Sequence, residues 1–223
     1  DNITVTVTFN DNVIVDNSSG NPRIQLETGT NDRYANYVSG NSTSILSFLY
    51  TVQSGDNTTD LDYTSTSSLS ANNGTIQDNA TNNANLTLLA PGSSGSLGAN
   101  KDIVIDTTAP TVSSIYPTDN QSGISITTDN ITVTFSEAMD TTSVTTNTSN
   151  TTCSGSLQNS SDNFSTCVQM SSTPSASNSN KTFTVTPSSS LSLNTTYKIR
   201  VTNGAKDSAS NALSSQWTTS TGF

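Results

Sequence analysis

The sequence predicts an all-β protein built from two tandem β-sandwich modules, and three observations carry this prediction. Apolar and polar residues alternate in short runs, as in Ile3-Thr4-Val5-Thr6-Val7-Thr8-Phe9. A period of two places the apolar side chains of such a run on one face of a strand. No run with helical periodicity accompanies them, so we expect no helices. The third observation is that the alternating pattern returns in the second half of the chain.

Two motifs recur in the same order along the chain. The segment Asn2-Ile3-Thr4-Val5-Thr6-Val7-Thr8-Phe9-Asn10-Asp11 returns about 126 residues later as Asn130-Ile131-Thr132-Val133-Thr134-Phe135-Ser136-Glu137. The segment Asp78-Asn79-Ala80-Thr81-Asn82 returns as Asp207-Ser208-Ala209-Ser210-Asn211. This self-similarity indicates two copies of one structural unit. We expect modules at 1–105 and 106–223, joined at the polar stretch Asp106-Thr107-Thr108-Ala109-Pro110.

Turn residues and alternation define the strands of the second module. We expect strands at 111–116, 131–135, 182–186 and 195–201, and a last strand within 215–221. Residues 153–157 and 164–168 have the pattern of two further strands, which flank a loop rich in Asn, Ser and Asp. About seven short strands separated by turns are typical of a two-sheet sandwich.

The composition limits the partners of the chain. The net charge is −10, charged residues make up only 11%, and no basic patch is present in the sequence. Such a surface repels nucleic acid and anionic lipid. The hydrophobic fraction of 30% raises disorder as an alternative, but the alternating runs argue against it. Without an apolar run of membrane-spanning length or a visible leader, we expect no membrane insertion and an excised or processed extracellular piece.

The two cysteines, Cys153 and Cys167, lie close together in the second module. A disulfide between them would close a loop and stabilise the fold by about 3 kcal/mol in the chain-entropy model. It would also imply an oxidising compartment. Two free thiols are the alternative, although exposed thiols in so polar a chain would be a liability.

Asparagine glycosylation is a second covalent modification that the sequence raises. Asn-x-Ser/Thr triplets occur fifteen times, whereas about nine would arise by chance from this composition. In a cell that glycosylates asparagine, many of them would carry sugar. The candidate sites are Asn41, Asn57, Asn147, Asn150, Asn159, Asn163 and Asn194.

The second module resembles the bacterial Ig-like domain first associated with surface-layer proteins. The resemblance covers residues 106–223 and rests on Thr108-Ala109-Pro110-Thr111-Val112, on residues 131–140, on Asn194-Thr195-Thr196-Tyr197 and on residues 206–213. One departure is Ser210, where the family often has glycine. The first module resembles a related class of Ig-like repeats in long bacterial surface proteins, through residues 46–52, Gly55-Asp56, and residues 60–63, 74–78, 91–92 and 95–101. Two tandem Ig-like sandwiches are implied, with roles in display, adhesion or assembly.

One strand has no counterpart in the first module. The second module has an initial strand at 111–116 before its 131–135 strand, whereas the first module starts directly at the equivalent of the later strand. We therefore expect an exposed sheet edge and a gap over the core of the first module. Either the chain was cut from a longer repeat array, or a neighbouring subunit supplies the strand.

Catalytic chemistry finds little support in the residues. The chain has no histidine, which removes His-based nucleophile activation and His metal sites. Two cysteines alone do not make a structural zinc site. Asp60 and Asp62 lie on one face of a strand-like segment, but nothing there indicates the apolar pocket that raises a carboxyl pKa. We expect these two carboxylates to be solvated and the protein not to be an enzyme.

A calcium site is the best metal hypothesis, and it rests on topology. In an Ig-like sandwich, Asp106, Glu137, Asp140, Asp207 and Asn211 would meet at one pole of the second module, facing the junction with the first. Carboxylate and amide oxygens suit Ca²⁺, which takes six to eight oxygen ligands. The alternative is that Asp207 and Asn211 only stabilise a turn through side-chain to backbone hydrogen bonds.

The function predicted from these patterns is mechanical. We expect an extracellular or cell-surface protein, either a spacer or a fibre-forming adhesive subunit that contacts neighbouring copies or repeats of itself. The alternative is a module whose loops bind carbohydrate or a host-surface protein. Tyrosines gathered on one loop face would favour that alternative, but Tyr34, Tyr37, Tyr50 and Tyr63 are spread along one module in strand-like alternation.

Overall fold

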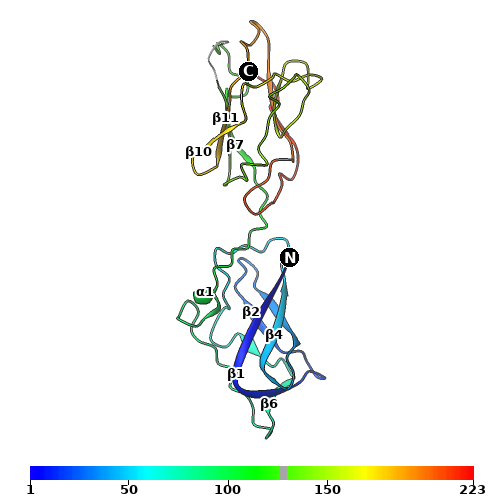
Figure 1. Ribbon diagram of the computed structural model, residues 1–223, viewed down its shortest axis with the longest axis vertical. Helices are drawn as coiled ribbons and strands as arrows, with labels where there is room; N and C mark the ends of the chain where they lie inside the picture. The colour runs from blue at the N-terminus through cyan, green and yellow to red at the C-terminus, as the bar shows by residue number, and fades with distance from the viewer. Residues whose placement is uncertain (126–129) are drawn as a thin grey trace. The chain divides into compact units, whose positions relative to one another are not determined.

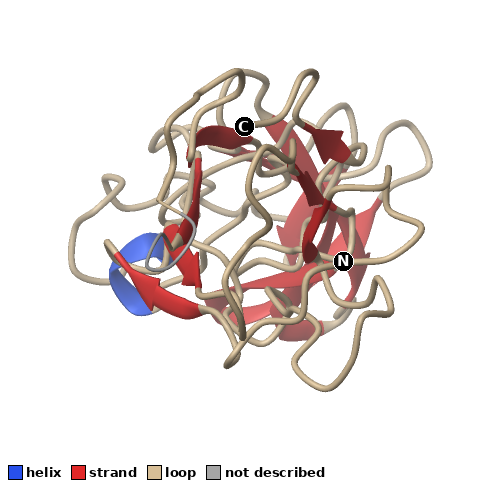
Figure 2. Cartoon of the chain, turned by 90° about the horizontal axis from the view of Figure 1, so that it is seen from above, coloured by secondary structure: helices blue, strands red, loops and turns tan. Residues whose placement is uncertain are grey.

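The computed structural model of the protein describes residues 1–125 and 130–223. Internal contacts divide the chain into two units, Asp1–Thr108 and Ala109–Phe223. Each unit consists mainly of strands and loops, with one short helix in unit one (Figures 1 and 2), and each has a buried apolar core of its own. The chain is therefore an all-β protein of the predicted class.

The strands of unit one form one antiparallel sheet in the order β5-β2-β3-β4-β1-β6. Its longest strand, β1, changes partner along its length: Asn2 to Thr8 pair with β4, and Val13 to Asp16 pair with β6. The register shift between Thr8 and Val13 marks the bulge at which β1 turns. The strands are β1 (Asn2–Asp16), β2 (Arg23–Leu26), β3 (Arg33–Ser39), β4 (Thr43–Thr51), β5 (Leu69–Ser70) and β6 (Thr75–Asp78).

Alternation places the core of unit one on one face of this sheet. In β4, Leu46, Phe48 and Tyr50 are buried while their neighbours are partly or fully exposed. Contrary to expectation, unit one also contains a short helix, α1 (Leu97–Asn100). The Ser96 side chain caps it by accepting a hydrogen bond from the Ala99 amide. A single capped turn has no periodicity that a sequence pattern could reveal.

Unit two contains two antiparallel sheets, in the orders β10-β11-β8-β7 and β13-β12-β9. Its central strand β8 is fully alternating, with Ile131, Val133 and Phe135 buried. The strands are β7 (Val112–Tyr116), β8 (Ile131–Phe135), β9 (Leu157–Ser160), β10 (Ser175–Ser177), β11 (Thr182–Val185), β12 (Lys198–Val201) and β13 (Trp217–Thr218).

The cysteine-bearing region differs from the prediction. Residues 153–156 and 164–168 are turns, bends and irregular loop rather than strands, and the strand of this region, β9, lies between them. All four residues of β9 are buried, although Gln158, Asn159 and Ser160 are polar. A strand with polar residues on both buried faces gives no apolar alternation, which is why the pattern misplaced it.

A surface aspartate holds the end of unit two in place. The Asp119 carboxylate accepts hydrogen bonds from the backbone N–H groups of Ser220, Thr221 and Gly222 and from the Ser220 hydroxyl. The Ser220 side chain and the Gly222 N–H are the main causes that lower the pKa of Asp119 to about 2. The ionised carboxylate therefore fastens the last residues of the chain to the loop after β7.

The two units repeat one pattern of pairing. In unit one, Val13 pairs with Asp78 and an isolated bridge joins Gln77 to Asn83. In unit two, Met139 pairs with Asp207 and a bridge joins Lys206 to Ala212. Each pair occupies the corresponding position of its repeat, so the two sequence motifs form corresponding structure.

Candidate functional site

The recurring Asp-x-Ala-x-Asn motif folds as the same turn in both units. Asp207 Oδ1 accepts hydrogen bonds from the backbone N–H of Ala209 (2.9 Å) and of Asn211 (2.8 Å), and Oδ2 accepts from the Asn211 side-chain amide (2.9 Å). Asp78 makes the corresponding bonds to Ala80 and Asn82, at 2.8, 2.9 and 2.8 Å. These bonds add to the main-chain hydrogen bonds of the turn, in which the Asp207 amide donates to the Asn211 carbonyl and the Asp78 amide to the Asn82 carbonyl. The motif is thus a structural device used twice.

Within unit two, the structure brings together two of the five residues predicted for calcium: a carboxylate oxygen of Glu137 and one of Asp207 lie within 4.8 Å of each other. Asp106, a third predicted ligand, belongs to unit one. Asp140 is not part of this group, and its carboxylate accepts hydrogen bonds from the Thr142 amide and hydroxyl. Both oxygens of the fully buried Asp207 also serve the turn described above. The set has the donor chemistry of a calcium site, and calcium binding there stays a prediction.

A buried carboxylate in unit one was not predicted. Asp56 is fully buried, with Oδ1 accepting from Arg33 Nε (2.8 Å) and Oδ2 accepting from the Tyr50 hydroxyl (2.7 Å) and the Gln53 amide (2.8 Å). Burial opposes ionisation, but the hydrogen bonds from Tyr50, Arg33 and Gln53 outweigh it and hold the pKa of Asp56 below its usual value. The ionised Asp56 carboxylate links Tyr50 at the end of β4 to Arg33 of β3 and to Gln53 of the following loop. We therefore assign Asp56 a structural role.

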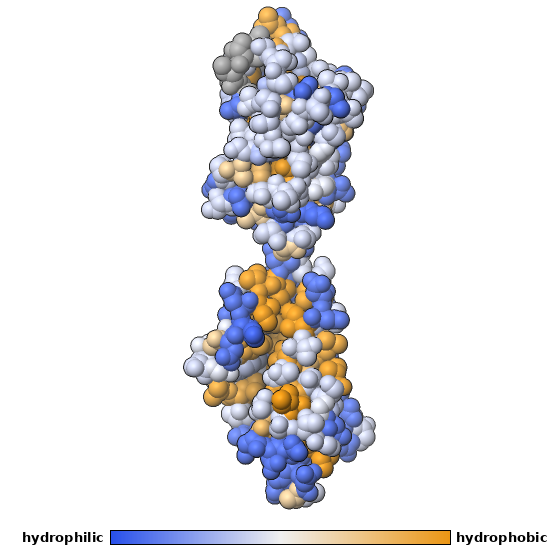
Figure 3. Space-filling view, viewed as in Figure 1, coloured by the Kyte–Doolittle hydropathy of each residue, from blue (hydrophilic) through white to orange (hydrophobic). Residues whose placement is uncertain are grey.

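The outer edge of β1 is the candidate site for a binding partner. Residues 2–8 of β1 pair with β4 on one side, and among the described residues no strand pairs with their other side. A groove of about 630 Å³ follows residues 3–9 and reaches core side chains, including Ile24, Tyr63 and Leu69. Figure 3 shows apolar surface gathered on the face of unit one that is turned to the viewer. This is the exposed edge and open core that the sequence predicts.

Comparison with known proteins identifies the family. The family model described as the bacterial Ig-like domain matches residues 106–221, just over half of the chain. The chain belongs to the bacterial Ig-like domain family. The matched segment contains β7 to β13, both cysteines and the second copy of the turn motif.

The other comparisons add little to this assignment. No curated protein matches the chain. Among solved structures, the N-terminal part of the bacterial S-layer protein SbsC matches with 21% identity and a TM-score of 0.36. The match covers 50% of this chain and 23% of that one, so the chain matches less than a quarter of that structure. Among the described residues, none of the helices has the length and apolarity needed to cross a bilayer.

The departure from the bacterial Ig-like domain pattern at Ser210 has a backbone explanation. Ser210 has φ +73°, and its counterpart in unit one, Thr81, has φ +67°. This left-handed region costs a residue with a Cβ about 1–2 kcal/mol, whereas glycine enters it freely. Glycine at this position would therefore suit the turn better than either residue present in this chain.

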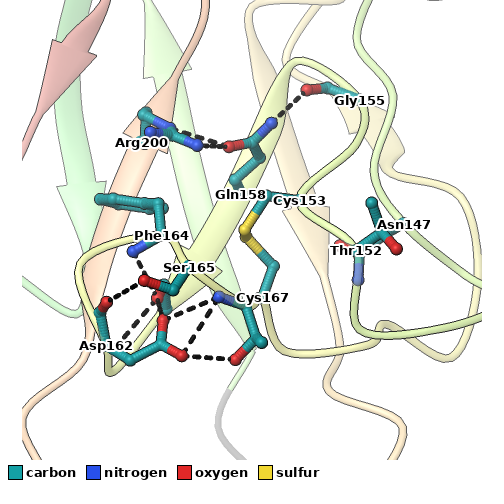
Figure 4. The surroundings of a disulfide bond; sticks show 12 residues. Asn147, Thr152, Cys153, Gly155, Gln158, Asp162, Phe164, Ser165, Cys167 and Arg200 are labelled. Carbon is teal, nitrogen blue, oxygen red and sulfur yellow. Dashed lines mark hydrogen bonds between the residues drawn. A yellow bond between two sulfur atoms is a disulfide. The ribbon is translucent and has the colours of Figure 1, made fainter.

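Figure 4 shows the disulfide of unit two and the side chains around it. Cys153 and Cys167 are bonded to each other, which is the pairing the sequence favours. Beside them, Asp162 accepts hydrogen bonds from the Thr166 hydroxyl and amide, and these bonds lower the pKa of Asp162 to about 2. The Arg200 guanidinium hydrogen-bonds to Gln158 and lies 3.9 Å from the centre of the Phe164 ring. Together these contacts order a loop that contains few apolar residues.

The candidate glycosylation sites fall into two groups. Asn147 and Asn159 are buried, at 3% and 1% exposure, so the folded protein does not offer them to an enzyme. The remaining candidates lie on the surface of the two units: Asn41, Asn57, Asn150, Asn163 and Asn194. Glycosylation of these five stays a prediction.

Proposed function

We propose that the protein is an extracellular, non-enzymatic structural component of a cell surface, acting as a spacer or as a fibre-forming adhesive subunit. The observation that carries the proposal is that the two units share a sequence motif that folds as the same turn, with corresponding hydrogen bonds and a corresponding pair and bridge beside it. A repeated module with its own core adds length without new chemistry. We take the two modules to be 1–105 and 106–223.

The surface chemistry supports this role. Net charge is −10 and the side chains facing solvent are mainly Ser, Thr and Asn, which keep a protein soluble without attracting polyanions. The disulfide supports an oxidising location. The polar anchors at Asp56, Asp78 and Asp207 stabilise loops that small cores alone would hold weakly.

Recognition of carbohydrate through exposed aromatic residues has weaker support. Tyr50 and Tyr63 are buried, and Tyr37 packs edge-on against Phe48. Tyr34 is 40% exposed on β3, where Arg23 lies over its ring. These rings do not form a shared platform, and core packing accounts for most of them.

Calcium at Asp106, Glu137 and Asp207 belongs to this proposal as a stabilising ion. Calorimetric titration of Ca²⁺ into the full chain tests it, with Glu137→Gln as the variant that removes one ligand charge. Saturable binding that the variant weakens would support the site. Heat changes that are identical in the two proteins would remove it.

The location and assembly of the native protein test the main proposal. Antibodies raised against the chain should label intact source cells in immunogold electron microscopy, with permeabilised cells showing no additional internal pool. The natively purified protein, imaged by negative stain, should appear as extended rods or fibres. Labelling that requires permeabilisation would contradict the proposal.

A further inference from the structure

The uncovered edge of β1 presents unused hydrogen-bonding groups. The Val52 amide donates to the Asp1 carbonyl at 2.9 Å, which fixes the odd-numbered residues of β1 as those that bond to β4. Because the bonding direction alternates along an antiparallel strand, Thr4, Thr6 and Thr8 direct their N–H and C=O groups to the open side. An edge of this kind is a template for another strand.

The apolar side chains beside this edge are less covered than their counterparts in unit two. Val7 and Phe9 are only partly buried in unit one. The corresponding Val133 and Phe135 are 0% and 2% exposed. The groove along β1 is also lined by Leu88, Leu97 and other apolar side chains. It therefore exposes both the backbone hydrogen-bonding groups of β1 and partly buried apolar side chains of the core.

Unit two shows what covers the equivalent edge. There β7 lies antiparallel to β8, and the Ser136 amide donates to the Thr111 carbonyl at 2.9 Å. In β7, Val112 and Ile115 pack against the core of unit two. The segment carries no charge, and Pro110 and Pro117 flank it. The strand β7 therefore indicates which kind of segment fits the edge of β1: an extended, uncharged strand whose apolar side chains pack against the core.

We propose that the groove along β1 binds an extended, uncharged peptide strand of the β7 type, which pairs antiparallel with residues 2–9. The register follows from the pairs of unit two, where Ser114 lies opposite Thr134 and Tyr116 opposite Thr132. With the offset of about 126 residues between the repeats, Thr8 corresponds to Thr134 and Thr6 to Thr132. In the bound strand, the residue at the position of Ser114 therefore lies opposite Thr8, and the residue at the position of Tyr116 lies opposite Thr6.

This inference goes beyond the proposed surface role and does not depend on it. Binding of a strand in the groove is a property of unit one that holds in solution, whereas the surface role concerns location and assembly. A chain that binds the strand but is absent from the cell surface, or the reverse, would separate the two claims.

A synthetic peptide with the sequence of residues 109–117, titrated calorimetrically into the full chain, tests the chemistry. We expect saturable binding of one peptide per chain. Replacing Val112 and Ile115 of the peptide by aspartate should weaken binding at least about tenfold, because both side chains would lose their burial. Absence of saturable binding up to about 1 mM peptide, or equal binding of the aspartate peptide, would overturn the proposal.

Two protein variants locate the binding. Leu97→Arg introduces a charge into the groove and should weaken binding at least about tenfold. Val38→Arg changes a side chain that is 52% exposed and lies outside the groove, and should leave the affinity unchanged. Equal effects of the two variants would place the peptide elsewhere and overturn the proposal, provided that both variants keep the circular dichroism spectrum of the parent.

Crosslinking tests the register. The chain has no free cysteine, so one introduced thiol is selective. A peptide with Ser114→Cys should form a disulfide with the Thr8→Cys chain, and a peptide with Tyr116→Cys with the Thr6→Cys chain. The exchanged combinations should react several times more slowly. Equal rates for all four combinations would refute the register, and faster self-crosslinking of the Thr6→Cys chain would assign the edge to a second copy instead.

Discussion

Replacing Asp56 by alanine should destabilise unit one by about 3–5 kcal/mol, because the change removes a buried, ionised acceptor and leaves its donors behind. The carboxylate accepts three hydrogen bonds of 2.7 to 2.8 Å. The Tyr50 hydroxyl would lose its partner at 1% exposure, at a cost of about 1–3 kcal/mol. Arg33 is 29% exposed along its side chain, so water would offset part of its loss. Asp56→Asn retains the shape and should cost about 1–3 kcal/mol.

Urea unfolding with two spectroscopic probes measures this effect within one chain. Four of the six tyrosines belong to unit one, so near-ultraviolet circular dichroism of tyrosine follows mainly that unit. Trp217, the only tryptophan, follows unit two and serves as the internal control. We expect the Asp56→Ala variant to shift the tyrosine transition to lower urea while the tryptophan transition stays in place. A loss below about 1 kcal/mol would refute the reasoning, because it would show that the anchored carboxylate contributes no more than an exposed ion pair.

Three further changes follow from the turns, the disulfide and the surface aspartates. Thr81→Gly should stabilise unit one by about 1 kcal/mol by removing a left-handed residue with a Cβ, whereas Ala80→Gly in the same turn should not, as judged by the tyrosine transition. Replacing Cys153 and Cys167 by serine should lower the free energy of unfolding of unit two by about 3 kcal/mol, measured from the tryptophan transition. An unchanged midpoint would contradict the stabilisation expected from closing this loop. The pKa of Asp119 in the folded state, about 2, lies below its unfolded value of about 3.9, so its contribution to stability is complete above about pH 4 and is lost as the pH falls through 2. Thermal midpoints between pH 7 and pH 2 check this, and a steep loss between pH 7 and pH 5 would contradict it.

Alternation was a reliable guide wherever one face of a strand is polar. The strand at 131–135 was predicted with its observed bounds because Ile131, Val133 and Phe135 are separated by threonines. The open edge of β1 was predicted from the repeat, because the strand at 111–116 in the second module had no counterpart among the strands expected in the first. The repeated turn was also readable, because an aspartate followed four residues later by asparagine has a specific hydrogen-bonding use.

Three other features could not be predicted from alternation or spacing: the strand β10, the burial of Asp56 and the hydrogen bonds of Asp140. β10 is a three-residue edge strand with every residue exposed, so no apolar side chain marks it. The burial of Asp56 depends on Arg33 and Tyr50, which reach it from other strands and cannot be paired with it from spacing alone. The proximity of Glu137 and Asp207 could be predicted from topology, but Asp140 could not be separated from them, because the sequence does not show that its carboxylate accepts hydrogen bonds from Thr142.

Hydrogen exchange at matched threonines tests most directly the central claim, that the chain contains one module twice and that the first copy has an uncovered edge. The amides of Thr6 and Thr8 should exchange rapidly, because they point to the open side of β1. The amides of Thr132 and Thr134 occupy the corresponding positions of β8, where they face the paired strand β7, and they should be protected. Addition of the peptide of residues 109–117 should slow exchange at Thr6 and Thr8 only. Protection of all four amides in the chain alone would contradict the account, because it would show that the edge of β1 is already paired.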